Sequence, residues 1–139
     1  MNVTRPSATV EMDVPFHDVD MMNIVWHGHY ARYFEIARCA LLDQLDYNYL
    51  QMKASGHEWP VVDLRIRYPG PARFGQRLTI TATLTDWDGR LRIAYEVRDK
   101  ATGSRLTRGH SVQVPVDIAT GERRLCTPPD LLARLEHLS

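Results

Sequence analysis

Alternating apolar and polar positions predict a strand near the start of the chain. Its apolar members stand two residues apart, which is the period of a half-buried strand, and they are Ala8, Val10, Met12 and Val14. Pro15 ends regular pairing because it lacks the N–H group that a central strand donates. A loop over residues 16–28 follows.

The segment over residues 29–46 has the period of a helix. Apolar side chains cover well over half of its circumference, and they are Ala31, Phe34, Ile36, Ala37, Ala40, Leu41, Leu42 and Leu45. A helix that is apolar nearly all round belongs in a protein interior. We therefore expect Tyr30, Tyr33 and Phe34 in the core, and we expect Cys39, inside the same pattern, to be a small buried residue.

The remaining pattern predicts one short helix, several strands and a helix at the end of the chain. The short helix covers Tyr49–Ala54 and stops at Gly56. Strands are expected over residues 61–68, 78–85, 91–98 and 106–116. The Asp-Gly pair at 88–89 predicts a hairpin turn, and the Pro-Gly-Pro at 69–71 predicts a bulge or an edge kink. The Pro-Pro-Asp at 128–130 opens the last helix.

The order of these elements predicts the fold class. A single helix can be apolar on most sides only if another element wraps around it, and a curved antiparallel sheet does so. We therefore expect an α+β protein, in which a curved antiparallel sheet wraps around a long central helix. The length of 139 residues suits a single domain over residues 1–139.

Charge and composition exclude some classes of partner. The chain has 17 basic and 17 acidic residues and a formal net charge of zero, so nothing draws it generally to nucleic acid or to an anionic membrane. No apolar run is long enough to span a bilayer, and the first residues lack the apolar core of a signal peptide. We therefore expect a cytoplasmic protein with no nucleic-acid or membrane partner.

The loop before the long helix is the candidate reaction centre. It crowds two carboxylates and three imidazoles into a short span, namely His17, Asp18, Asp20, His27 and His29. The start of a helix presents oriented backbone N–H groups, and a carboxylate can act as a base or a nucleophile. We expect no metal, because no third or fourth ligand has a helpful spacing, and no cofactor.

Two blocks of sequence stand out in and after the loop. The first comprises Asp18-Val19-Asp20, Ile24-Val25-Trp26-His27, Tyr30 and Phe34-Glu35-Ile36-Ala37-Arg38. The second comprises Ile66-Arg67-Tyr68 and Pro71-Ala72-Arg73-Phe74-Gly75. Together they resemble the motifs of the hotdog-fold acyl-CoA thioesterases, particularly the 4-hydroxybenzoyl-CoA and short-chain acyl-CoA group. The resemblance covers about residues 10–116.

The resemblance implies hydrolysis of an acyl-CoA or acyl-carrier-protein thioester to a free acid and a thiol. It assigns Asp20 as the catalytic carboxylate, either as a general base to water or as a nucleophile that forms a mixed anhydride. It also implies that a backbone N–H near His27, Gly28 or His29 polarises the thioester carbonyl. Asn23 stands beside the substrate where relatives often have glycine, so we expect a positive φ there.

The resemblance also implies a homodimer or homotetramer with active sites between subunits. Glu58 and Trp59 would then face Asp20 of the other subunit, where Trp59 either closes the acyl pocket or packs in the interface. Exposed arginines could bind coenzyme A phosphates, and the candidates are Arg73, Arg90 and Arg92. Other arginines are too scattered in sequence to predict a basic patch for an acidic carrier protein, namely Arg65, Arg67 and Arg105, together with Arg73.

Two further roles and two rival functions remain. Asp18 is expected to hold loop N–H groups, and Glu35 to form a salt bridge with Arg38. The chain could instead be a non-catalytic module that binds acyl thioesters, or catalyse another hotdog reaction such as enoyl-thioester hydration or dehydration. Hotdog branches that catalyse the second reaction resemble an arrangement of a histidine with an aspartate or glutamate on the helix, whereas this chain carries its aspartate before the helix.

Overall fold

The computed structural model describes residues 5–137. In chain order its helices and strands are β1 (Ser7–Asp13), the short 3-10 helices η1 (Phe16–Asp18) and η2 (His27–His29), α1 (Tyr30–Gln44), α2 (Tyr49–Ala54), β2 (His57–Glu58), β3 (Val61–Arg67), β4 (Arg77–Asp86), β5 (Leu91–Asp99), β6 (Arg105–Gln113), β7 (Val116–Asp117) and α3 (Pro129–His137). None of the helices described is long and apolar enough to cross a membrane.

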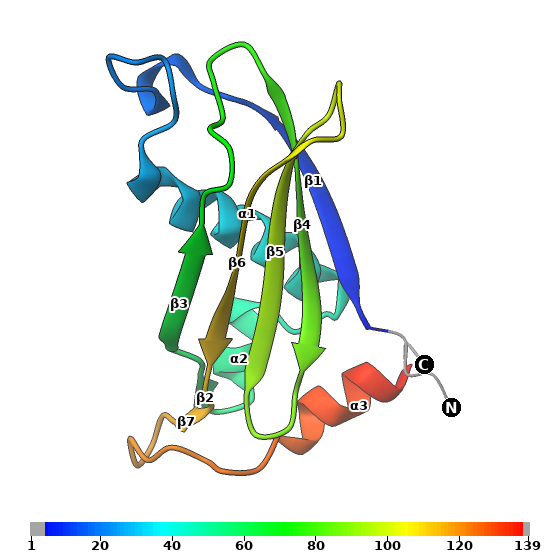
Figure 1. Cartoon of the computed structure of the whole chain (residues 1–139). Coiled ribbons are helices and arrows are strands. Elements are labelled where there is room, and N and C mark those ends of the chain that lie inside the picture. The colour runs from blue at the N-terminus through cyan, green and yellow to red at the C-terminus, as the bar shows by residue number, and fades with distance from the viewer. Residues whose placement is uncertain (1–4, 138–139) are drawn as a thin grey trace.

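A five-stranded antiparallel sheet in the order β1-β4-β5-β6-β3 forms the body of the molecule. The sheet curves around α1, which lies across its concave face (Figure 1). The two shortest strands, β2 and β7, pair separately beyond one end of this sheet. The predicted α+β hotdog architecture is therefore confirmed.

The core lies between α1 and the concave face of the sheet. Side chains of β4 and β5 alternate between buried and half-buried, as the period-two pattern predicts. The ring of Phe34 stacks on that of Tyr95, with centroids 4.4 Å apart and planes 5° apart. Gly109 permits this close approach, since a Cβ there would lie 2.2 Å from the Arg65 carbonyl oxygen and 2.8 Å from the Phe34 ring.

Most elements fall where the pattern predicts them. The helix α2 has the predicted bounds, and Gly56 follows it with a φ of 87°. The Pro-Gly-Pro at 69–71, however, forms neither a bulge nor an edge kink, because it lies in a loop that separates β3 from β4. That loop reaches the same end of the sheet as the segment between β1 and α1 (Figure 1).

The predicted burial of Cys39 is wrong. Its side chain is exposed, and so is that of Ile36 on the same helix, which is 43% accessible. The sheet covers only one side of α1, and the opposite side of the helix stays exposed within a single chain. Tyr30, Tyr33 and Phe34 point to the covered side and are buried as expected.

Candidate active site

The loop between β1 and α1 folds as a small hairpin around Asp20. The Asp20 N–H donates to the Ile24 carbonyl at 2.9 Å, and the Asn23 N–H donates to the Asp20 carbonyl at 3.0 Å. Asn23 closes this turn with a φ of 61°, which confirms the expected positive value. The Val25 N–H donates to the Ala72 carbonyl at 2.7 Å, so the hairpin is attached to the loop between β3 and β4.

Asp20 is the first residue of the turn in this hairpin, and its side chain is exposed. Its Oδ1 accepts hydrogen bonds from the Met22 N–H at 2.8 Å and the Ile24 N–H at 3.5 Å. Its Oδ2 accepts none from the described residues. One oxygen therefore fixes the carboxylate to its own turn, and the other is available to a water molecule or a substrate.

Asp18 is the buried counterpart of Asp20, with only 1% of its surface accessible. Its Oδ2 accepts from the Tyr33 hydroxyl at 2.6 Å and from Arg32 Nη2 at 2.5 Å, and both donors belong to α1. Burial alone would raise the pKa of Asp18, but these two hydrogen bonds outweigh it and hold the pKa below its usual value. We expected Asp18 to hold loop N–H groups; it instead joins the loop to side chains of α1.

Two imidazoles lie close to the buried Asp18 carboxylate, which anchors the loop to α1. His29 Nε2 lies 3.8 Å and His17 Nε2 3.6 Å from Asp18 Oδ1. His29 Nδ1 is also 3.4 Å from Arg32 Nη2. The side chain of His29 is therefore directed to Asp18, which leaves His27 as the imidazole on the Asp20 side. No cluster of three or more potential metal ligands occurs within residues 5–137.

The start of the helical segment presents free backbone donors. The N–H groups of His27 and Gly28 donate to no described acceptor, as is usual in the first turn of a helix. Gly28 has no side chain, and the Trp26 ring occupies the place where one would stand, since a Cβ on Gly28 would lie 2.3 Å from that ring.

Asp20 and His27 line one cavity of about 380 Å³, whose other walls are Ile24, Val25, Trp26, Tyr30, Tyr68, Pro69, Gly70 and Pro71. The Tyr68 hydroxyl donates to the His27 carbonyl at 3.4 Å. Partial burial raises the pKa of Tyr68, and Tyr30 acts in the same direction, so the phenol stays protonated at neutral pH. Sequence reasoning did not assign Tyr68 to the site, although it lies in the second block of the family motif.

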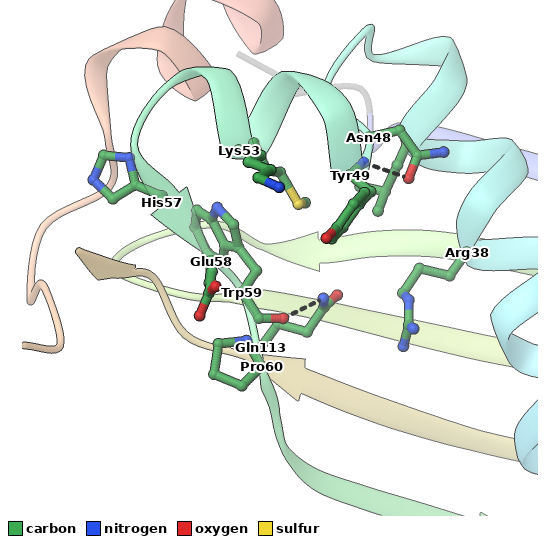
Figure 2. Close-up of a pocket in the computed structure, with 11 residues that line it drawn as sticks. Arg38, Asn48, Tyr49, Lys53, His57, Glu58, Trp59, Pro60 and Gln113 are labelled. Atoms are coloured by element: carbon green, nitrogen blue, oxygen red, sulfur yellow. Dashed lines mark hydrogen bonds between the residues drawn. The ribbon is translucent and has the colours of Figure 1, made fainter. Parts of the chain in front are cut away.

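Glu58 and Trp59 lie at the other end of β3 and line a second cavity of about 340 Å³ between α1, α2 and β6 (Figure 2). Trp59 is buried, and its Nε1 donates to the Tyr47 hydroxyl at 3.3 Å. Gln113 Nε2 donates to the Trp59 carbonyl at 2.8 Å, whereas Gln113 Oε1 is buried without a partner. Arg38 also lines this cavity, and its Nη2 lies 3.8 Å from Glu35 Oε1, which confirms the predicted salt bridge.

The three arginines proposed for phosphates are divided between the two ends of the sheet. Arg73 pairs with Ile24 in an isolated bridge and so lies beside the Asp20 hairpin. Arg90 forms a salt bridge with Asp86 at 2.9 Å, and Arg92 donates to a threonine, both near the hairpin of β4 and β5. That hairpin lies at the opposite end of the sheet from the β1–α1 loop (Figure 1). One chain alone therefore does not bring the three together.

Comparison with known proteins decides the family. The model of the thioesterase-like superfamily matches residues 14–135. The chain belongs to this superfamily. YneP of Bacillus subtilis, provisionally named an acyl-CoA thioesterase, is 31% identical over 104 residues, which cover 69% of this chain and 75% of YneP. The protein is accordingly a thioester hydrolase.

Solved structures confirm the fold of this thioesterase. The 1,4-dihydroxy-2-naphthoyl-CoA thioesterase Slr0204 of Synechocystis superposes with a TM-score of 0.83 at 20% identity, covering 95% of this chain and 97% of Slr0204. A 4-hydroxybenzoyl-CoA thioesterase mutant bound to 4-hydroxybenzoyl-CoA gives a TM-score of 0.80 at 18% identity, covering 94% and 99%. The resemblance to the hotdog thioesterases that the loop and helix predict is confirmed.

Proposed function

We propose that this thioesterase hydrolyses an acyl-CoA or acyl-carrier-protein thioester, with Asp20 as its catalytic carboxylate. The observation that carries the proposal is that Asp20 and the helical segment beginning at His27 border one cavity. The carboxylate either removes a proton from the attacking water or attacks the carbonyl carbon to give a mixed anhydride and the free thiol. Water then hydrolyses the anhydride and regenerates the carboxylate.

The free N–H groups of His27 and Gly28 are suited to the carbonyl oxygen. That oxygen gains negative charge as the tetrahedral intermediate forms, and fixed N–H donors stabilise the charge without reorganising. They are backbone groups at the start of a helical segment, so the helix dipole favours the same charge. In this scheme the Tyr68 hydroxyl holds the His27 carbonyl, and thereby the peptide units that carry the donors.

We also propose that the active site is completed by a second copy of the chain. The strand β3 is an edge of the sheet, and three of its apolar side chains are accessible: Val61 to 43%, Val62 to 58% and Leu64 to 44%. An open apolar edge invites pairing with another strand. Antiparallel pairing of two β3 strands about a two-fold axis satisfies both edges with one isologous interface.

This pairing explains why the two cavities lie at opposite ends of β3. The strand begins just after Trp59 and Pro60, which line the second cavity, and ends just before Tyr68, which lines the Asp20 cavity. In an antiparallel pair, the start of one strand lies beside the end of the other. The Asp20 cavity of one subunit would therefore meet the Trp59 cavity of its partner, which would accommodate the acyl group. Two such dimers could associate through their sheets into a tetramer.

The test of catalysis compares the wild type with Asp20→Asn on a panel of acyl-CoA and acyl-carrier-protein thioesters. We expect loss of the carboxylate to lower kcat by about a hundredfold or more, while the folded structure persists because the Asp20 side chain is exposed. Equal rates would refute the role of Asp20. Turnover in heavy-oxygen water tests for the anhydride, since label enters the Asp20 carboxylate only when water attacks the Asp20 carbon of that intermediate.

The test of assembly is the charge substitution Leu64→Arg in the middle of β3. Light scattering should show a dimer or tetramer for the wild type and a smaller species for the variant. Activity should fall with the loss of assembly, because each site would lack its second cavity. A wild-type protein that is monomeric and fully active would refute the two-chain site and leave the role of Asp20 standing.

A further inference from the structure

Five arginines gather on the outer face of the sheet, at the end where β3 finishes and β6 starts. We call them the arginine patch: Arg65, Arg67, Arg98, Arg105 and Arg108. The strand register places them together, since Arg67 pairs with Arg108 and Arg98 pairs with Arg105. The sequence alone predicted no basic patch from Arg65, Arg67 and Arg105, because only the strand pairing brings them together.

A bulge in β6 brings Arg105 into the patch. Arg105 and Arg108 are three residues apart, and in a regular strand they would face opposite sides of the sheet. The pairing with β5 shifts between residues 97 and 98, so that Thr107 pairs with Val97 but Arg105 pairs with residue 98. The extra residue turns Arg105 to the outer face, which is a typical effect of a β-bulge.

The patch carries more positive charge than its own structure neutralises. Its one carboxylate neighbour on the outer face of β5 is Glu96, which pairs with Arg98 and lies 3.9 Å from Arg105 Nε. Within residues 5–137, Arg65, Arg67 and Arg108 form no ion pair. Like charges directly opposite each other on paired strands destabilise a sheet, so a bound anion would relieve this repulsion.

The patch shares a wall with the Asp20 cavity. A hollow of about 620 Å³ is lined by four arginines of the patch together with Tyr68 and Pro69. A second hollow of about 370 Å³ shares three of these arginines. Tyr68 and Pro69 also line the cavity that holds Asp20. A ligand whose reacting group lies at Asp20 can therefore extend over these two residues onto the patch.

We infer that the arginine patch binds the phosphate groups of the substrate's coenzyme A moiety. This inference rests on the proposed function. One guanidinium group can donate two parallel hydrogen bonds to two oxygens of a phosphate, whereas the ammonium group of a lysine acts as a point charge. The arginines are spread over three adjacent strands, a width of about 10 Å, and coenzyme A carries a pyrophosphate and a separate ribose phosphate. The phosphopantetheine arm of a carrier protein has only one phosphate, so it fits fewer of these arginines.

The test measures hydrolysis of one acyl group on two thiols, coenzyme A and N-acetylcysteamine, which has no phosphate. The variants are Arg108→Gln, which lies away from the β3 edge, and the double variant with Arg67→Gln. We expect KM for the acyl-CoA to rise about tenfold for each lost arginine–phosphate contact, with kcat unchanged. The N-acetylcysteamine thioester should be hydrolysed at the wild-type rate. The matched control is Arg123→Gln, which replaces an exposed arginine near β7 at the other end of the sheet. This variant should hydrolyse both thioesters as the wild type does.

Three results with these two thioesters would overturn the inference. They are an equal loss on both thioesters, no loss on either, or a selective loss in Arg90→Gln instead of the patch variants. A larger loss on an acyl-carrier protein than on the acyl-CoA would assign the patch to an acidic carrier surface. Binding of adenosine 3′,5′-bisphosphate to Asp20→Asn protein, with and without Arg108→Gln, separates the two proposals. If Arg108→Gln weakens binding of the bisphosphate but the wild-type protein hydrolyses no thioester, the proposed function fails and the phosphate site stands.

Discussion

Removing the Tyr33 hydroxyl should destabilise the protein in a way that depends on pH. Tyr33 donates to the buried Asp18 carboxylate at 2.6 Å, and its replacement by phenylalanine leaves Arg32 as the one remaining close donor. A hydrogen bond to a buried charged acceptor contributes about 1.5–3 kcal/mol. We therefore expect Tyr33→Phe to lower the free energy of unfolding by about 2 kcal/mol at pH 7. Urea denaturation at one fixed protein concentration measures this difference, because subunit association would otherwise shift the midpoint.

The sign of the pH effect follows from the pKa of Asp18. The folded protein holds this pKa below its usual value of 3.8, so folding favours the charged carboxylate. The stabilisation is complete above that value and is lost as the pH falls through the lower pKa of the folded state. The gap between wild type and Tyr33→Phe should therefore narrow on acidification below 3.8.

Tyr30→Phe is the matched control for this experiment. Tyr30 is equally buried, but its hydroxyl accepts from the neutral Ala72 N–H at 3.2 Å. We expect this variant to cost about 1 kcal/mol, with little change between neutral and acidic pH. A Tyr33→Phe loss below about 0.5 kcal/mol, or one that is the same at every pH, would refute the view that Asp18 is a charged anchor.

Three further substitutions test the loop, the core and the second cavity. Asn23→Val places a β-branched residue at a φ of 61° and should cost about 1–2 kcal/mol with a loss of activity, whereas Asn23→Gly should be close to neutral in both assays. Gly109→Ala forces a Cβ to 2.2 Å from the backbone of β3, so urea denaturation should show a loss of about 3 kcal/mol; a loss under 1 kcal/mol would mean that the strands move apart freely. Gln113→Leu removes a buried oxygen that has no partner, together with one hydrogen bond to Trp59. It should change the acyl preference on a substrate panel while kcat for the best substrate stays within about threefold. An unchanged preference would exclude contact between Gln113 and the acyl group.

Local patterns predicted the elements of the fold because those patterns act over a few residues. The alternation in β4 and β5 and the boundaries of α2 depend on neighbours in sequence, and both were confirmed. The exposure of Cys39 depended instead on how much of α1 one sheet can cover. A periodic pattern shows that a helix is apolar all round, but it does not show whether its own chain or another chain covers each side.

The candidate site divides in the same way. The motif identified the loop with Asp20 and His27, and these two residues do line one cavity. The contribution of Tyr68 and the position of Arg105 depended on strand pairing and on a bulge, which no short pattern encodes. The role of Asp18 was missed for a similar reason. Its partners are side chains of α1, fourteen and fifteen residues further along the chain, rather than the loop amides beside it.

The link between Asp18 and α1 has a consequence for how substrate preference can evolve in this protein. Two hydrogen bonds to Asp18 attach the loop that carries Asp20 to the helix whose start carries the proposed backbone donors. Under the proposed pairing, the acyl group would lie in the Trp59 cavity of the other subunit, at the far end of β3. On this proposal, substitutions there would alter the acyl preference without disturbing Asp20 or the proposed N–H donors. The residues proposed to cleave the thioester and the residues proposed to select its acyl group would thus lie at separate ends of β3.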